Sequence, residues 1–130
     1  MIAALLLTLV SFAAADAPPD VAEFLRSLGV ALAEGEPQPF LDKFDPAWSG
    51  YHQLHDDVID LMARYQVGSV IEIVSDQGDE QKRTLELDWL LTIEGVEERR
   101  KIVKIMIEKQ GKKWKIATLD PASLFTASRK

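Results

Sequence analysis

The chain has 130 residues, of which 47% are hydrophobic and 28% are charged, a balance typical of an ordinary globular protein. This length suits a single domain, because domains usually contain roughly 100–150 residues. The net charge of −6 argues against a nucleic-acid partner, which would require a surplus of Lys and Arg. Because the sequence has no cysteine, disulfides, thiolate nucleophiles and thiolate metal sites are excluded.

Residues 1–17 differ in composition from the rest and are predicted to be a signal peptide. An apolar run covers residues 2–10, and small residues that suit cleavage follow near Ala15 and Ala17. The run is shorter than the roughly 20 residues of a membrane span, so no stable span is expected after cleavage. No Lys or Arg precedes the run, and a buried N-terminal helix or strand is the alternative. We therefore expect a periplasmic or secreted protein with one domain over residues 18–130.

Three helices are expected in the first half of this domain. Asp20, with Glu23 three residues later, has the pattern of a capping box, and apolar residues then recur at helical spacing. A short second helix is expected to begin at Pro37, and a third to begin near Ser49 and end at Gly68. The third helix should bury one apolar stripe. The stripe consists of Leu54, Val58, Leu61, Met62 and Tyr65.

From Ser69 onward the hydrophobic period changes to two, which indicates strands. We predict a short strand at residues 70–74, a long strand around 85–93, a third around 102–107 and a last strand at 113–119. The short turns between them favour an antiparallel meander. Helices followed by strands predict an α+β domain, in which three N-terminal helices pack on a four-stranded antiparallel sheet.

The long strand has an apolar face that includes Trp89, whereas Glu86 and Asp88 belong to its other face. Leu90 interrupts this alternation, so we expect a bulge or a sharp bend near it. Acidic residues predominate before the third strand and basic residues from there on, so acidic strands are expected to face Lys104 and Lys115 across the sheet. Anion binding by the Arg-Arg-Lys run at 99–101 is an alternative to a solvated strand.

The whole pattern resembles the nuclear transport factor 2-like superfamily, which includes ketosteroid isomerase, scytalone dehydratase and SnoaL-type polyketide cyclases. The resemblance covers nearly everything after the signal peptide. It depends on the helix and strand order, the Asp88-Trp89 pair, the Gly-Lys-Lys-Trp-Lys-Ile segment at 111–116 and the tail from Pro121 to Phe125. It is strongest with small exported members of unassigned activity. The resemblance implies a cystatin-like cone, in which a curved sheet wraps around the helices and leaves a pocket at its open end.

Enzymes of that superfamily use an inward carboxylate or a His–Asp pair in the pocket, with Tyr as a hydrogen-bond donor. Strand parity places Asp88 outward, so the expected inward carboxylate is missing and no catalytic residue is predicted. His52 and His55 are the only histidines. With Asp56 they provide too few ligands for a metal site, and neither a metal nor another cofactor is predicted. His55 beside Tyr51 is either a proton shuttle or a buried histidine that a backbone carbonyl satisfies.

The sequence therefore favours a non-catalytic binding or accessory domain with a small apolar pocket. The predicted pocket is lined by Trp48, Tyr51, His55, Met62 and Trp89. Its expected occupant is a small apolar ligand, although a partner protein is also compatible with the pattern. One alternative is a lyase or isomerase that uses His55 and Tyr51 as an acid–base pair. The other is a structural homodimer whose pocket is filled by its own side chains.

Overall fold

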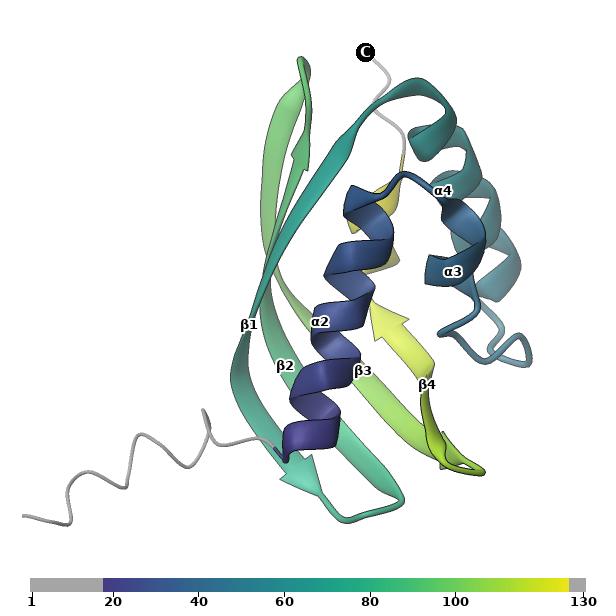
Figure 1. The fold of residues 1–130 in the computed structure, drawn as a ribbon, viewed down its shortest axis with the longest axis vertical. Helices are drawn as coiled ribbons and strands as arrows, with labels where there is room; N and C mark the ends of the chain where they lie inside the picture. The colour runs from purple at the N-terminus through teal and green to yellow at the C-terminus, as the bar shows by residue number, and fades with distance from the viewer. Residues whose placement is uncertain (1–17, 127–130) are drawn as a thin grey trace, which may run out of the picture.

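The computed structural model describes residues 18–126 of the chain (Figure 1). The predicted signal peptide, residues 1–17, lies outside the described residues, as do residues 127–130. Among the described helices, none combines the length and the apolar character that crossing a membrane requires.

Three helices precede the sheet, as the sequence predicts. They are α2 (Pro19–Ala33), α3 (Pro37–Leu41) and α4 (Tyr51–Arg64). The first two begin at prolines, whose fixed φ suits the first helical position. The expected capping box is wrong: Pro18 occupies the N-cap position and Asp20 lies in the first turn, where its carboxylate accepts a hydrogen bond from the Trp114 indole.

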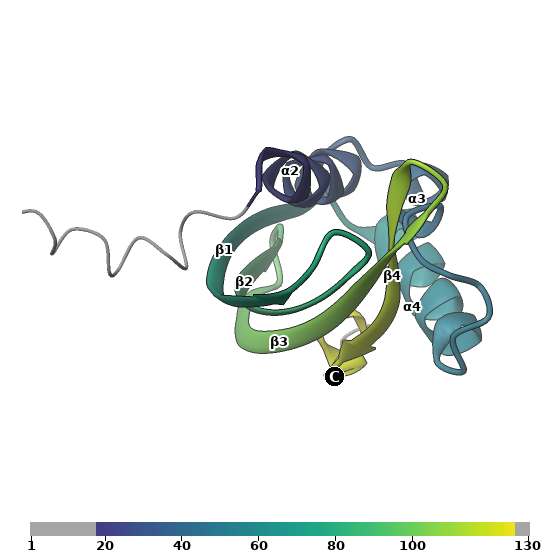
Figure 2. The ribbon, with the colours of Figure 1, turned by 90° about the horizontal axis from the view of Figure 1, so that it is seen from below.

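Four antiparallel strands follow in the order β1-β2-β3-β4. They are β1 (Val67–Gly78), β2 (Lys82–Ile93), β3 (Glu97–Gln110) and β4 (Lys113–Asp120), and the short 3₁₀ helix η1 (Ala122–Phe125) ends the described chain. The sheet curls, and α2 lies across the gap between β1 and β4 (Figure 2). The predicted α+β fold, with three helices packed on a curved four-stranded antiparallel sheet, is confirmed.

Strand facing follows the predicted parity along β2. Trp89 is fully buried, whereas Glu86 and Asp88 alternate with it on the outer face of the sheet. The expected bulge near Leu90 is wrong, because Leu90 pairs with Val70 on one side and Arg100 on the other without a register shift. Leu90 is simply an outward-facing apolar residue. The register shifts instead between residues 73 and 75 of β1 and between residues 106 and 107 of β3.

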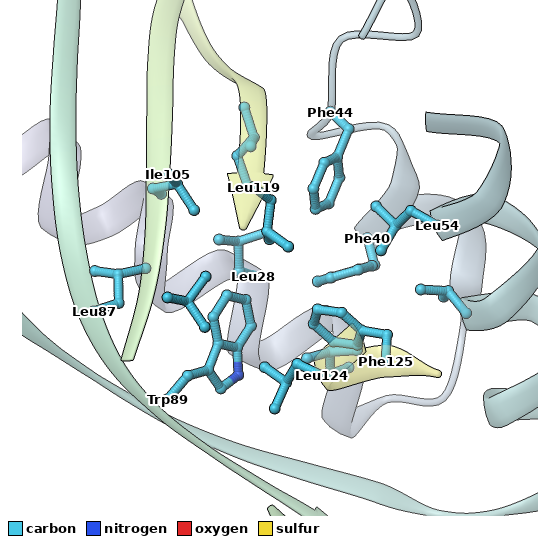
Figure 3. Packing of buried hydrophobic residues seen from close by; sticks show 14 of the residues in the cluster. Leu28, Phe40, Phe44, Leu54, Leu87, Trp89, Ile105, Leu119, Leu124 and Phe125 are labelled. Atoms are coloured by element: carbon cyan, nitrogen blue, oxygen red, sulfur yellow. The ribbon is translucent and has the colours of Figure 1, made fainter. Parts of the chain in front are cut away.

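A row of aromatic rings crosses the interior from the sheet to the loop before α4. The ring of Phe125 lies 5.4 Å from that of Trp89 on one side and 5.4 Å from that of Phe40 on the other. The row continues from Phe40 to Phe44 at 5.2 Å and from Phe44 to Trp48 at 6.3 Å. Figure 3 shows Trp89, Phe125, Phe40 and Phe44 packed together between β2 and the helices. These side chains fill the space in which the family resemblance implies a pocket.

Candidate functional site

The five side chains predicted to line a pocket belong mostly to the packed core. Trp89 is fully buried, and its indole N–H donates a 2.8 Å hydrogen bond to Ser69 Oγ. Trp48 stacks on Phe44, and Met62 packs against the core while partly buried. None of the five predicted residues lines the clefts described below. Trp48 and Trp89 lie at opposite ends of the aromatic row, so the five residues do not surround one cavity.

His55 and Tyr51 do lie together, but at the surface of α4. Their ring centroids are 6.1 Å apart, and His55 Nδ1 lies 3.1 Å from a carboxylate oxygen of Asp56. The expectation of a buried histidine is wrong, because 41% of the His55 side chain is exposed. Among residues 18–126, no ionisable residue is buried as a whole, although the Asp76 side chain is only 4% exposed. An acid–base mechanism that uses His55 would therefore operate at a solvent-exposed surface.

Replacing His55 with alanine is expected to change the free energy of unfolding by less than about 0.5 kcal/mol, as is usual for exposed positions. Chemical denaturation followed by tryptophan fluorescence measures this difference. A loss of several kcal/mol would show instead that the imidazole is part of the core.

Over residues 18–126, no three His, Asp or Glu side chains are grouped so that they could hold a metal ion. The Arg-Arg-Lys run also fails to form one cationic patch, because neighbouring residues of a strand face opposite sides. Arg99 donates hydrogen bonds to the carbonyl oxygens of Leu124 and Thr126 at 2.7 and 2.6 Å. Arg100 lies on the outer face and pairs with Asp88 through contacts of 3.0 and 2.8 Å. Anion binding by the run is therefore not supported.

The outer face of the sheet carries the charge pairs that strand parity predicts, with one change of partner. The Arg100 guanidinium, rather than a lysine, binds Asp88 and holds the pKa of that carboxyl below its usual value. Glu86 lies opposite Lys104 in the register and accepts a 3.2 Å hydrogen bond from Ser75 Oγ. Both carboxylates therefore belong to a solvated face, away from the aromatic row.

A different feature, a cleft of about 620 Å³ between α2 and β1, is the best candidate for a binding site. From α2 it is lined by Ala22, Leu25, Arg26, Gly29, Val30 and Ala33, and from β1 by Ser69, Ile71, Glu72 and Ile73. The residues Ala22, Gly29 and Ala33 recur on one side of the helix, where their small side chains leave space beside the strand. This volume is within the range of small-molecule sites. The spacing of Ala22, Gly29 and Ala33 in the sequence was the signal that could have indicated the cleft.

The cleft is apolar at its base and charged at its rim. Leu25 is nearly buried and Ile71 and Ile73 are partly buried, whereas Val30 is 48% exposed. At the rim, Arg26 pairs with Glu23 on its own helix. Glu72 is exposed and forms no salt bridge within the described part of the chain. The cleft can therefore accept an apolar group together with a cationic one.

The two outer edges of the sheet differ in how they are covered. At β4, the Ile116 amide donates to the Lys43 carbonyl at 2.8 Å, and the Asp45 amide donates to the Ile116 carbonyl at 2.9 Å. Phe44 thereby forms a parallel bridge to Ile116. β1 pairs only with β2, and no other segment among residues 18–126 forms a backbone hydrogen bond with the outer edge of β1. The cleft therefore runs beside a strand edge that has no backbone hydrogen-bond partner, although α2 packs against the same strand where Gly29 faces Ser69.

A second cleft, of about 590 Å³, lies where the first turn of α2 meets the β3–β4 turn. The Trp114 indole N–H donates to Asp20 Oδ2 at 3.0 Å, and the Lys109 ammonium lies 3.4 Å from the same oxygen. The hydrogen bond from Trp114, assisted by Lys109, holds the pKa of Asp20 below its ordinary value of 3.8. These contacts join the first turn of α2 to the β3–β4 end of the sheet.

Asp20 is expected to contribute stability at neutral pH and to lose that contribution in acid. Because its folded pKa lies below the unfolded value of 3.8, the contribution is present above that value and disappears as the pH falls through the folded pKa. Asp20→Asn should therefore lower the free energy of unfolding at pH 7, and the difference from the wild type should shrink in acid. Urea denaturation across this pH range measures it. A difference that does not depend on pH would contradict the assignment.

Proteins of known structure share this fold at low sequence identity. An NTF-2-like protein of unknown function from Shewanella oneidensis is 10% identical, with a TM-score of 0.67 over 77% of this chain and 93% of that one. Bd1075 from Bdellovibrio bacteriovorus is 13% identical, with a TM-score of 0.69 over 78% of this chain, but this chain spans only 38% of Bd1075. A Nostoc punctiforme protein of unknown function with a cystatin-like fold is 15% identical, with a TM-score of 0.57 over 78% of this chain and 90% of that one. The sequence matches no protein-family model and no curated protein. These similarities establish the fold alone.

Proposed function

Starting from this nuclear transport factor 2-like fold, we propose that the chain is an exported, non-catalytic binding or accessory domain that binds its partner at the surface. Because the fold hosts many activities, the proposal depends on the site. Its main support is the aromatic row through Trp89, Phe125 and Phe40, which occupies the interior. The enzyme alternative would need an enclosed acid–base group, and His55 is half-exposed.

The α2–β1 cleft is the binding surface in this proposal. It combines an apolar base with an open side, whereas the interior is closed by the protein's own side chains. A small apolar ligand would contact Leu25, Ile71 and Ile73, and a partner protein could cover the same surface. The predicted pocket residues Trp48, Tyr51 and Met62 then have a packing role.

Site-specific photo-crosslinking in the cell envelope of the source organism tests the proposal. A benzophenone side chain at Val30, in the cleft, is expected to yield a discrete cross-linked partner. The same group at Ile59, which is 39% exposed on α4, serves as the matched control. The absence of cross-links from the cleft, from α4 and from the outer sheet face would contradict a surface-binding role.

Export is supported by the apolar run at residues 2–10 and by the small residues near Ala15 and Ala17. The intact mass of protein recovered from the periplasm or medium tests it. The expected mass is that of the chain without its first 15 or 17 residues. Full-length protein confined to the cytoplasm would contradict export.

A homodimer is the second candidate, because the outer face of the sheet carries exposed apolar residues among its charged ones and is uncovered by the described helices. Val70, Val74 and Ile102 are each about half exposed on this face. Charges of both signs lie on each half of this face: Glu72, Glu86 and Lys82 on the β1–β2 half, and Arg100, Lys104, Lys115, Glu108 and Asp120 on the β3–β4 half. The exposed apolar residues, rather than a division of charge, therefore support this candidate. Light scattering should then show a dimer, and Ile102→Glu should dissociate it; a wild-type monomer contradicts this candidate.

A further inference from the structure

The outer edge of β1 presents backbone groups that form no hydrogen bond with any other segment of residues 18–126. An edge strand directs about half of its N–H and C=O groups away from its neighbour, and these groups form a template for another strand. Proteins usually guard such edges with Lys, Pro, a bulge or a covering segment. β4 has such a cover at Phe44. The regular part of β1 before its register shift, residues 67–73, has neither Lys nor Pro, and Glu72 is its only charged residue.

The α2–β1 cleft adds a side wall to this free edge. Ser69 to Ile73 line the cleft from the strand, a length of about 13 Å at roughly 3.3 Å per residue. An added strand would place alternate side chains toward Leu25, Ile71 and Ile73 at the base of the cleft. Main-chain hydrogen bonds would then supply affinity, and the cleft would supply selectivity.

We propose that the α2–β1 cleft binds an extended segment of a partner polypeptide, which joins the sheet as a new strand beside β1. This inference rests on the proposed function and specifies its partner. The segment alternates apolar residues with basic ones. The apolar residues enter the cleft and the basic ones face the outer side.

Charge supports a basic segment. The outer side of the β1–β2 half carries Glu72 and Glu86, and the neighbouring Asp88 is already paired with Arg100. Glu72 makes no salt bridge with any residue in the 18–126 range. Arg100 attracts Glu72 only from beyond salt-bridge contact, so a Lys or Arg on the added strand would be a direct partner for this carboxylate across the new strand pair.

A second copy of the chain fits this edge less well. If two copies paired through β1, their α2 helices would approach each other along the same junction. Each helix would then present its own Arg26 at the rim of the cleft. A peptide strand brings no second helix to the junction.

The probe is a fluorescein-labelled heptapeptide of alternating Lys and Val, titrated into the whole domain and followed by anisotropy. Two backbone-methylated versions block either the odd or the even amides, and only one of them should lose binding, because one set of amides faces β1. In hydrogen exchange, outward-facing amides of β1 should exchange freely alone and become protected when the peptide is bound. A version with Glu in place of Lys should bind more weakly.

Two pairs of variants locate the site. Glu72→Lys should weaken binding of the Lys–Val peptide about fivefold, since it replaces an attractive cross-strand pair with a repulsive one, whereas Glu94→Lys, in the β2–β3 turn, should not. Ala33→Leu places a larger side chain in the cleft and should abolish binding. Because Leu also favours helix, α2 should keep its structure. Ala63→Leu makes the same substitution at an exposed position of α4 and should leave binding intact.

Several outcomes would overturn the inference. They are equal binding by both methylated peptides, no protection of β1 at millimolar peptide, and insensitivity to Ala33→Leu. Self-association that Ala33→Leu abolishes would also overturn it, because the occupant would then be a second copy. Cross-links from α4 or the outer sheet face, without any from Val30, would refute strand addition while leaving the proposed binding function in place.

Discussion

Replacing Phe125 with alanine is expected to lower the free energy of unfolding by about 3–5 kcal/mol, the usual cost of removing a buried aromatic ring. The ring is fully buried between Trp89 and Phe40, with centroid distances of 5.4 Å to each. It belongs to η1, which Arg99 holds against β3 through hydrogen bonds to the Leu124 and Thr126 carbonyls. Urea denaturation followed by tryptophan fluorescence measures the change.

Phe24→Ala is the matched control for this experiment. Phe24 is only partly buried and lies outside the aromatic row, so its loss should be clearly smaller. Equal losses for the two variants would show that Phe125 has no special place in the core. A loss below about 1 kcal/mol at Phe125, well under the usual range, would mean that the interior is open enough to admit a ligand.

Removing the charge of Arg83 is expected to cost about 3 kcal/mol, because it leaves a nearly buried carboxylate without its partner. Arg83 Nε donates to Asp76 Oδ1 at 2.8 Å, and the two side chains are only 15% and 4% exposed, respectively. The same guanidinium also donates to the Asp79 carbonyl at 2.8 Å, so the pair anchors the β1–β2 turn. Arg83→Met, measured by chemical denaturation, tests this cost.

A double variant separates the ion pair from the packing. Asp76→Leu with Arg83→Met should recover much of the loss, because buried pairs are often replaceable by apolar residues. Arg26→Met is the control, since its pair with Glu23 is more than half exposed and should contribute less than about 1 kcal/mol. Similar losses at Arg26 and Arg83 would contradict the argument from burial.

The fold could be predicted because two long patterns determine it. In β2, five alternate apolar residues from Leu85 to Ile93 specify one buried face, and each of them is buried in the structure. In α4, Leu54, Val58 and Leu61 specify one buried stripe. Each pattern repeats over many residues, so a single exception such as Leu90 does not change the outcome.

Local details were harder to predict because tertiary contacts decide them. Asp20 has the sequence of a helix cap, but its carboxylate is engaged by Trp114, which lies far along the chain. β1 extends well beyond the predicted residues 70–74, because pairing with β2 carries Gly68 and Ser69 into the ladder. His55 lies close to the apolar stripe in helical projection, yet nothing packs over it closely enough to bury it.

The candidate site was missed for a different reason. The family resemblance implied a pocket at the open end of the cone, and Trp48 and Trp89 were assigned to its lining. Large rings instead pack against one another, as Phe125 does against Trp89. The open space lies beside Gly29 and Ala33, where side chains are small. An open cleft is thus marked in the sequence by small residues rather than by aromatic ones.

The unequal edges of the sheet also limit how copies of this protein can polymerise. An endless head-to-tail filament requires two different free edges, so that each subunit offers one and occupies another. Here Phe44 covers the middle of β4 and η1 lies against β3, while β1 stays open. Pairing through β1 alone can at most close a symmetric pair and then stop. The fold therefore leaves one strand edge free without allowing endless strand addition through that edge alone.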